Sequence, residues 1–359
     1  MKAAIMRGGK IVADEIEAPK PGAGEVLVKT LACGICGSDL HTLRHGHDLV
    51  EKSKQTGGQF AMDLDKDVVM GHEFCAEILD YGPDTIKTHP VGTRVCSMPV
   101  SFKNGTAVTV GYSNEAPGGY AEQMTLFEPM LLPVPNGLAT NLAALTEPMA
   151  VGLHAVQKSN INKHEVPLVI GCGPVGLAVI VALKRQGIGP IIAADFSPRR
   201  RALAEKLGAD IIINPAQTSP YESWLEVGGK SADGELLPAD PMTGMPTLRQ
   251  AVFFECVGVP GLIQQLMQGA PKAARIVVVG VCMETDSFQP LFGINKELNI
   301  QFVLAYSAEE FAQTLHHIAE GDIDVEPLIT GTVNIAGVAG AFNDLGDPEQ
   351  HAKIIVVPD

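Results

Sequence analysis

The feature that most constrains the fold of this chain is an alternation of apolar strands and amphipathic helices that begins near residue 154. Six short apolar runs have the length of buried strands, and helical patterns lie between them at 175–186 and 199–207. This alternation predicts a doubly wound parallel sheet, the Rossmann type of α/β domain, over 154–326. The predicted strands are 166–171, 191–195, 210–213, 251–257, 275–281 and 298–304.

A glycine-rich turn, GCGPVG, follows the first of these strands and opens the first helix. Its glycines permit a tight turn and a close approach of the backbone to a pyrophosphate, whose charge the helix N-terminus favours. Asp195 lies 19 residues after Gly176, at the end of the next strand, where a carboxylate can accept from both ribose hydroxyls. The candidate cofactor-binding residues of the turn are Gly171, Gly173, Pro174, Val175 and Gly176.

The choice between NAD and NADP depends on charges behind this turn. Asp195 would repel a 2′-phosphate, which favours NAD, whereas Arg199 and Arg200 follow closely and could tolerate that phosphate. Arg200 is therefore included among the cofactor-binding candidates, and NADP remains the less favoured cofactor. The competing interpretation is an ordinary strand–helix junction that happens to contain three glycines.

The remainder of the chain has a different sequence pattern. Residues 1–153 are rich in short strands separated by Pro-Gly turns, and 327–359 return to short strand-like pieces. We expect these two segments to form one β-rich domain. Residues 215–247 are rich in Pro, Gly, Ser and Asp and predict a loop, with one or two helical turns around 221–227. A chain of 359 residues is long enough for two such domains.

Composition excludes several classes of function. The net charge of −15, without any cluster of basic residues, argues against nucleic-acid binding. The N-terminus has no apolar signal region, and no apolar run reaches the length of a membrane span. The seven cysteines are odd in number and lie mostly within apolar segments, so they do not suggest a disulfide framework. We expect a cytoplasmic protein that binds small molecules and no membrane.

Three short stretches of the first 150 residues carry residues that zinc prefers. They contribute Cys36 in CGICGSDLH, His72 and Glu73 in GHEF, and Glu147 in LTEPM. Zinc takes Cys sulfur, His nitrogen and carboxylate oxygen, and a catalytic site leaves one position open. These positions are far apart in sequence, so their spacing alone leaves other interpretations open. A single Cys is usually a small buried hydrophobe, and a Glu before Pro is usually a solvated helix start.

Four motifs taken together, in this order and with similar gaps, resemble the zinc-dependent medium-chain alcohol dehydrogenases. They are CGICGSDLH, GHEF, TEPMAVGLHAV and GCGPVGLAVI, supported by LGA at 207–209, ECVG at 255–258 and KEL at 296–298. The likeness is to the branch of threonine and polyol dehydrogenases. The resemblance implies a GroES-like catalytic domain joined to the Rossmann domain, and hydride transfer between an alcohol and NAD to give a ketone or aldehyde.

The resemblance also implies roles for particular residues. Cys36 and His72 match zinc ligands, Glu73 matches a carboxylate that binds the metal directly or lies just behind its ligands, and Glu147 occupies the third protein-ligand position. Ser38 matches the hydroxyl that contacts the alcohol, and His41 matches the distal histidine of a proton relay. Which of the two glutamates binds the metal directly is left open at this point.

The chain departs from the family pattern in three places. No cysteine occurs between Cys96 and Cys172, so a four-cysteine structural zinc is not expected; the resemblance then implies one zinc per chain, and 97–117 predicts a loop or hairpin. The polar stretch 42–67 predicts a mobile surface loop, with His45 and His47 as alternative ligands or pocket residues. Ala305-Tyr306 stands where polyol-type relatives carry an Arg-Tyr pair, which favours a fairly apolar secondary alcohol.

Two other functions remain open from the sequence. The same site with permanently held NAD would catalyse dismutation or epimerisation, and a chain of this fold could also sense dinucleotides without catalysis. Relatives pair by extending the Rossmann sheet across a two-fold axis, and 291–304 could do so here. We therefore expect a homodimer or a homotetramer.

Overall fold

The computed structural model describes residues 1–358 apart from 59, 61, 104 and 136. Residue contacts divide the chain into two compact units, Met1–Pro148 with Ser307–Asp359, and Met149–Tyr306. The expected division lay at 153/154 and 326/327, so the difference is largest at the second boundary. It arises because helix α9 (Ala308–Ala319) packs against α2 (Thr140–Ala143) of the first unit.

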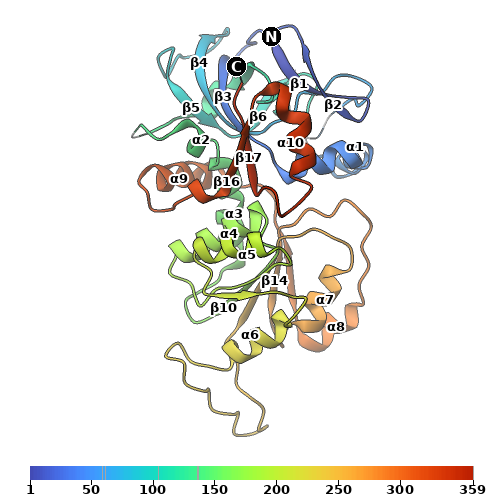
Figure 1. Cartoon of the computed structure of the whole chain (residues 1–359), viewed down its shortest axis with the longest axis vertical. Coiled ribbons are helices and arrows are strands. Elements are labelled where there is room, and N and C mark those ends of the chain that lie inside the picture. Colours follow the sequence, from blue (N-terminus) through green and yellow to red (C-terminus); the bar gives the residue numbers. More distant parts are fainter. Residues whose placement is uncertain (59, 61, 104, 136, 359) are drawn as a thin grey trace. The chain divides into compact units, whose positions relative to one another are not determined.

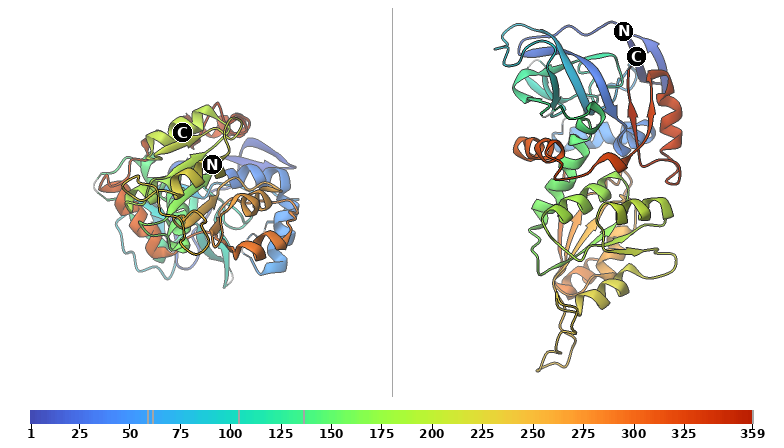
Figure 2. Two further views of the ribbon diagram at one scale, coloured as in Figure 1. Left: turned by 90° about the horizontal axis from the view of Figure 1, so that it is seen from below. Right: turned by 60° about the vertical axis from the view of Figure 1, so that its left-hand side comes forward.

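The second unit is a six-stranded parallel sheet with the order β12-β11-β10-β13-β14-β15, which confirms the predicted doubly wound fold. Helices α4 and α5 lie on one face of this sheet and α6, α7 and α8 on the other (Figures 1 and 2). Its strands are β10 Val166–Ile170, β11 Ile192–Ala194, β12 Ile211–Ile213, β13 Ala251–Glu255, β14 Arg275–Val278 and β15 Asn299–Phe302. Its helices are α4 Pro174–Arg185, α5 Pro198–Lys206, α6 Pro220–Gly228, α7 Leu262–Gly269 and α8 Pro290–Lys296.

Local sequence signals set the helix ends of this unit. Ser197 caps α5 by accepting a hydrogen bond from the Arg200 backbone N–H at 3.1 Å, and Pro198 occupies the first helical position. Beyond the helix, Gly208 has a φ of 113°, a conformation that favours glycine. The helical turns predicted around 221–227 are confirmed as α6, whose Trp224 is fully buried and donates to the Val166 carbonyl at 3.0 Å.

The first unit is built around a seven-stranded sheet with the path β16-β17-β3-β4-β5-β9 and β8 paired to β3. Strand β17 pairs with β3, so the C-terminal segment lies beside the N-terminal one (Figure 1). Two further pairs of strands, β1-β2 and β6-β7, form small sheets of their own. The strands of the whole unit are β1 Lys2–Arg7, β2 Lys10–Glu15, β3 Glu25–Gly34, β4 Glu73–Tyr81, β5 Arg94–Ser97, β6 Val100–Lys103, β7 Thr106–Thr109, β8 Gln123–Phe127, β9 Leu131–Pro133, β16 Ile329–Val333 and β17 Lys353–Val356.

The helices of the first unit vary widely in length, from four residues in α2 to 20 in α1. They are α1 Gly37–Thr56, α2, α9 and α10 Val338–Asp344, with 3-10 turns at Glu128–Met130, Glu326–Leu328 and Ile335–Gly337. A further helix, α3 Thr146–Ser159, runs across the division between the units. None of the helices in the described part of the chain combines the length and the apolar character that a membrane crossing needs.

One prediction about the first unit is wrong. The stretch 42–67 was expected to be a loop, but residues up to Thr56 continue helix α1, which kinks at His45 and ends at Gly57 with a φ of 69°. The physical reason is tertiary packing: Gly46 faces Leu64 so closely that a Cβ there would lie 3.1 Å from a leucine methyl carbon. By contrast, the expectation of a loop or hairpin at 97–117 is met by the β6–β7 hairpin.

Candidate metal centre and dinucleotide site

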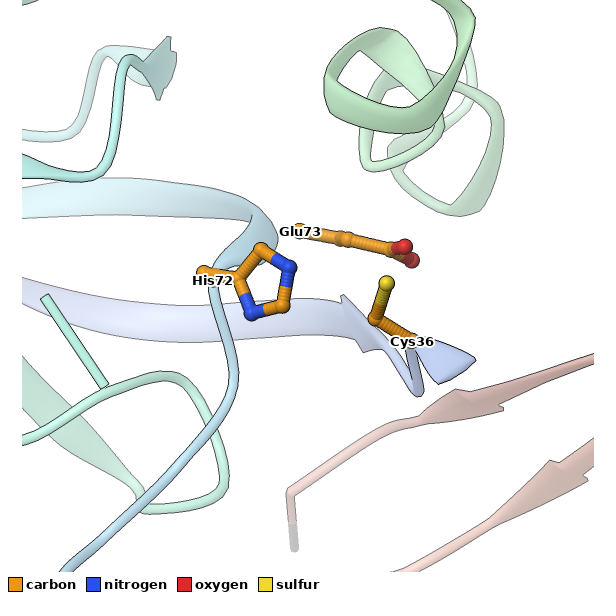
Figure 3. Close-up of side chains that lie close together, drawn as sticks. All are labelled: Cys36, His72 and Glu73. Atoms are coloured by element: carbon orange, nitrogen blue, oxygen red, sulfur yellow. The ribbon is translucent and has the colours of Figure 1, made fainter. Parts of the chain in front are cut away.

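Strand pairing brings the metal-ligand candidates of the first unit together. Cys36 follows β3, and Glu73 begins β4, which runs antiparallel to β3 with Gly34 opposite Glu73. One ligand atom from each of Cys36, His72 and Glu73 lies within 4.8 Å of the others (Figure 3). Gly34 is required here, because a Cβ at that position would collide with the Glu73 carboxylate. A thiolate, an imidazole and a carboxylate at this spacing fit a zinc ion.

A buried carboxylate orients this cluster from behind. Asp39 accepts hydrogen bonds from the Cys36 backbone N–H at 3.0 Å, from Tyr112 at 3.0 Å and from Tyr120 at 2.6 Å. Its Oδ1 lies 3.4 Å from Nδ1 of His72. Burial would raise the pKa of Asp39, but the charge of the nearby His72 imidazole and the hydrogen bonds from Tyr120 and Cys36 outweigh it, and the pKa falls below its usual value. Asp39 is therefore an ionised acceptor that faces the imidazole.

The Asp39 carboxylate also favours a defined state of His72. Burial would lower the pKa of His72, but Asp39 and Cys36 raise it well above the usual value. Nδ1 of this imidazole is buried and has no well-formed hydrogen bond. A metal bound at Nε2 would displace the proton there, while the proton kept on Nδ1 faces Asp39, the usual arrangement for a histidine ligand.

A lysine from the C-terminal strand binds the third member of the cluster. Nζ of Lys353 lies 2.7 Å from both carboxylate oxygens of Glu73 and donates to the Ile35 carbonyl at 3.0 Å. Both side chains are fully buried. Burial would lower the pKa of Lys353, but Glu73 first, and then Cys36 and Glu147, raise it above its usual value. Lys353 is thus the counter-ion of the Glu73 carboxylate.

The remaining candidates of the first unit lie around this cluster. Glu147, in the first turn of α3, is buried and its charge acts on Lys353, but it is outside the group of three described residues that lie within 4.8 Å. Ser38 and His41 lie one turn apart on α1, and Ser38 Oγ is 2.8 Å from the Tyr112 hydroxyl. Burial, His45 and Arg44 lower the pKa of the half-buried His41, so its imidazole is neutral at neutral pH.

The glycine turn of the second unit has the geometry of a phosphate-binding loop. Gly171 has a φ of 91°, and Gly173 precedes α4, whose first turn contains Pro174 and Val175. A Cβ at Gly176 would collide with the Gly171 carbonyl, so only glycine allows the helix to approach the strand this closely. The backbone N–H groups at this helix start are suited to an anion.

Charged side chains beside this turn come from the segment after β11. Asp195 accepts from the backbone N–H of Cys172 at 2.7 Å and of Ser197 at 2.8 Å, one bond on each oxygen. Each oxygen can accept a second bond, so the carboxylate remains available to hydroxyl groups. The Arg200 guanidinium lies about 4 Å from the position of a Cβ on Gly173, and its buried Nε has no hydrogen-bond partner.

Sequence reasoning missed four residues of the first-unit site, namely Asp39, Tyr112, Tyr120 and Lys353. Asp39 lies three residues after Cys36 in the same motif, which was the one available signal. The two tyrosines and Lys353 reach the cluster through strand pairing and loops that join distant segments, as for Lys353 and Glu73, which are separated by 280 positions. No local pattern marks such residues.

Comparison with known proteins identifies the family. Residues 22–136 match the alcohol dehydrogenase GroES-like domain, and residues 174–320 match the zinc-binding dehydrogenase domain. The chain is 30% identical to (R,R)-butanediol dehydrogenase of Bacillus subtilis over the full length of both proteins. A crystal structure of 2R,3R-butanediol dehydrogenase from Bacillus subtilis has a TM-score of 0.80 at 29% identity, covering 100% of this chain and 99% of that one.

Two further relatives agree. Sorbitol dehydrogenase of Bacillus subtilis is 27% identical, with 100% of this chain and 98% of that protein covered. The alcohol dehydrogenase RspB of Escherichia coli, solved with NADH, has a TM-score of 0.79 at 27% identity, with 99% of each chain covered. The chain belongs to the zinc-containing medium-chain alcohol dehydrogenase family. It is a zinc-dependent NAD(P) dehydrogenase of the type that acts on alcohols and polyols.

Proposed function

We propose that this enzyme oxidises a fairly apolar secondary alcohol to a ketone with NAD, and that each chain holds one zinc. The observation that carries the proposal is the convergence of Cys36, His72 and Glu73 beside the hydroxyl-bearing first turn of α1. Cys36 and His72 would hold the ion together with Glu73 or Glu147. Bound there, zinc would supply Lewis-acid polarisation of the alcohol oxygen.

The side chains around the cluster provide the rest of the site chemistry. Ser38 would contact the hydroxyl group of the substrate, and His41 would receive the proton that leaves the pocket. The lowered pKa of His41, caused by burial first and then by His45 and Arg44, keeps its imidazole able to accept a proton at neutral pH. Lys353 holds the carboxylate of Glu73 beside the thiol of Cys36.

Replacement of His41 tests this proton path. His41→Gln is expected to slow alcohol oxidation about ten- to a hundredfold below about pH 8, because the general base is lost. At higher pH hydroxide replaces it and the defect should shrink. The pH profile of kcat/KM for both proteins measures this. A profile that the substitution leaves unchanged would remove His41 from the mechanism.

The preference for NAD rests on the carboxylate of Asp195 beside the glycine turn. Asp195→Ala is expected to lower the ratio of kcat/KM with NAD to kcat/KM with NADP at least about tenfold, because loss of a hydrogen bond to a charged group has an effect of this size. Asp195→Asn is the companion variant of similar shape without the charge; its single amide oxygen can accept from only one of the Cys172 and Ser197 N–H groups. If wild-type enzyme prefers NADP, Arg199 or Arg200 dominates the local field and the assignment fails.

The substrate class rests on Ala305, which stands where polyol-type relatives carry a guanidinium, and on the relative named for a secondary alcohol, butanediol. A polyol without hydrogen-bond partners leaves buried polar groups unpaired. The test is NAD reduction with purified enzyme over aliphatic, aromatic and polyhydroxy alcohols. Medium-sized secondary alcohols should exceed sorbitol, glucose and threonine in kcat/KM. A best rate with sorbitol or glucose would overturn the apolar substrate class.

We also propose that the enzyme is a homodimer or homotetramer formed through the edge of the Rossmann sheet. Strand β15 is the last strand of that sheet, and apolar side chains on or beside it and on α8 are 61% to 74% exposed. They are Leu291, Ile294, Phe302 and Leu304. Large exposed apolar patches mark interfaces. Light scattering of the purified enzyme tests this, and a monomeric mass would contradict it.

A further inference from the structure

Glu255 is a buried residue of the second unit that belongs neither to the metal centre nor to the glycine turn. It is the last residue of β13, it opens the ECVG segment, and it is 2% exposed. Its Oε1 accepts hydrogen bonds from the backbone N–H groups of Val257 at 2.7 Å and Gly258 at 2.8 Å. Burial raises the pKa of this carboxyl group, the two N–H groups oppose that rise, and the charge of Asp286 adds to it. The side chain thus fixes the loop that follows β13.

The same residue also contacts the loop that follows the neighbouring strand β14. The backbone carbonyl of Glu255 accepts from the N–H groups of Val279 and Gly280, both at 2.9 Å. A Cβ on Gly280 would lie 2.8 Å from Oε2 of Glu255 and would collide with the backbone nitrogen of Gly258. The two loops are therefore in direct contact, and no side chain fits between them.

The glycine turn after β10 is packed against these loops. A Cβ on Gly171 would lie 2.6 Å from a methyl carbon of Val257. A Cβ on Gly258, whose φ is 74°, would lie 2.6 Å from the backbone of Val281. Val257 and Val281 are 40% and 44% exposed, so the loops also present apolar side chains to solvent. Three loops therefore interlock at the carboxyl ends of β10, β13 and β14, which are neighbours in the sheet.

The strand order indicates which half of a dinucleotide these loops would meet. The pyrophosphate is expected at the glycine turn, because ligands of such sheets bind outside the carboxyl ends of the strands. The contact proposed for the adenosine ribose is Asp195, which follows β11. In the sheet, β11 and β13 lie on opposite sides of β10. A dinucleotide with its adenosine half toward β11 therefore has its other half toward β13 and β14.

We propose that Glu255 is a positioning residue for the nicotinamide half of the cofactor, because it holds the loops after β13 and β14 in the conformation that receives this half. The inference rests on the proposed contact between Asp195 and the adenosine ribose. The role lies in the reach of one carboxylate oxygen to two N–H groups, and not in the charge. Loops that leave this conformation lower the apparent affinity by the fraction of molecules that remain competent.

Two conservative variants separate reach from charge. Both N–H groups bond to a single oxygen of Glu255, so the one carbonyl oxygen of glutamine can accept from both, and Glu255→Gln keeps the geometry without the charge. Glu255→Asp keeps the charge but is one methylene shorter, which draws the oxygen away from the loop. A role in positioning predicts that the glutamine variant resembles the wild type and that the aspartate variant does not.

The experiment compares the dissociation constants of NADH and ADP for the full-length enzyme by isothermal titration calorimetry. ADP carries the adenosine and the pyrophosphate but lacks the nicotinamide half. Glu255→Asp should weaken NADH about tenfold, the factor expected for a hydrogen bond to a charged group, and leave ADP unchanged. Glu255→Gln should leave both ligands close to the wild-type values. Amide hydrogen exchange at 256–258 and 279–281 should be faster in the free Glu255→Asp enzyme, which reports the loops without any ligand.

Two other carboxylates of the second unit provide controls. Glu165 is buried at the amino ends of the same strands, where it accepts from the Asn162 N–H at 2.8 Å and from the Arg275 guanidinium at 2.6 Å and 2.9 Å. Glu165→Asp should therefore leave the ratio of the two dissociation constants unchanged. Asp195→Ala should weaken NADH and ADP alike, because both carry the adenosine ribose.

The outcomes separate this role from general damage and from the proposed function. Equal weakening of NADH and ADP by Glu255→Asp, no weakening of NADH, or a glutamine variant as weak as the aspartate variant would overturn the proposal. A change of the ratio in Glu165→Asp as large as in Glu255→Asp would do the same. If Asp195→Ala leaves ADP binding unchanged, the placement of the adenosine half is refuted instead, and this inference with it.

Discussion

Replacing Cys36 with serine is expected to lower alcohol oxidation at least about a thousandfold, the several kcal/mol that metal polarisation contributes to such a reaction. The Cys36 sulfur is one of the three ligand atoms that converge within 4.8 Å. A serine hydroxyl is not ionised at neutral pH and is a poor zinc ligand. The fold should persist, since Cys36 is only partly buried. Metal analysis should find one zinc per wild-type chain and none in the variant, with an unchanged circular dichroism spectrum.

Cys282→Ser is the matched control for this experiment. Cys282 is also a partly buried free thiol, but it follows β14 in the second unit. That variant should keep its zinc and its activity. If the Cys36 variant retains stoichiometric zinc and normal turnover, the cluster is not the catalytic metal site. Two tightly held zincs per wild-type chain would show that a site has been missed, and His45 and His47 on α1 would be the first residues to replace.

The second unit was predictable because its signals are local. Strands β10, β11 and β12 are wholly apolar runs, and the ends of α5 follow from Ser197 and Pro198 at its start and Gly208 just beyond its last residue. The turn requires glycine for two reasons: Gly171 adopts a positive φ, and there is no room for a Cβ at Gly176. Such features depend on neighbouring residues and can be read from a single sequence.

The first unit was less predictable because its structure depends on distant contacts. The polar stretch after His41 carries a weak helical pattern, and what extends α1 to Thr56 is packing against later residues such as Leu64 at Gly46. In the site, the metal-ligand candidates came from motif resemblance, whereas their supporting groups did not. Tyr112, Tyr120 and Lys353 come into contact with the cluster only through the folded chain, and composition does not predict such contacts.

Lys353 provides the largest expected effect on stability. Lys353→Met leaves the fully buried carboxylate of Glu73 without its cation and the Ile35 carbonyl without its donor. Removing one partner of a buried ion pair typically destabilises a protein by about 3–5 kcal/mol, because the remaining charge is uncompensated. The measurement is urea unfolding of the metal-free enzyme, where no metal ion can replace the cation. Near-ultraviolet circular dichroism, to which Tyr81, Tyr112 and Tyr120 of the first unit contribute, follows the loss of tertiary structure.

The controls separate charge from packing. Lys353→Arg keeps a cation and should cost less than the methionine variant. Adding Glu73→Gln to Lys353→Met removes the unpaired charge, so the double variant should regain part of the lost stability even though it has one more substitution. Trp224, the one tryptophan of the chain, lies in the second unit and its fluorescence reports that unit separately. If Lys353→Met unfolds at the same urea concentration as the wild type, the buried pair does not stabilise the first unit. The role of Lys353 would then be confined to its action on the carboxylate of Glu73 at the metal site.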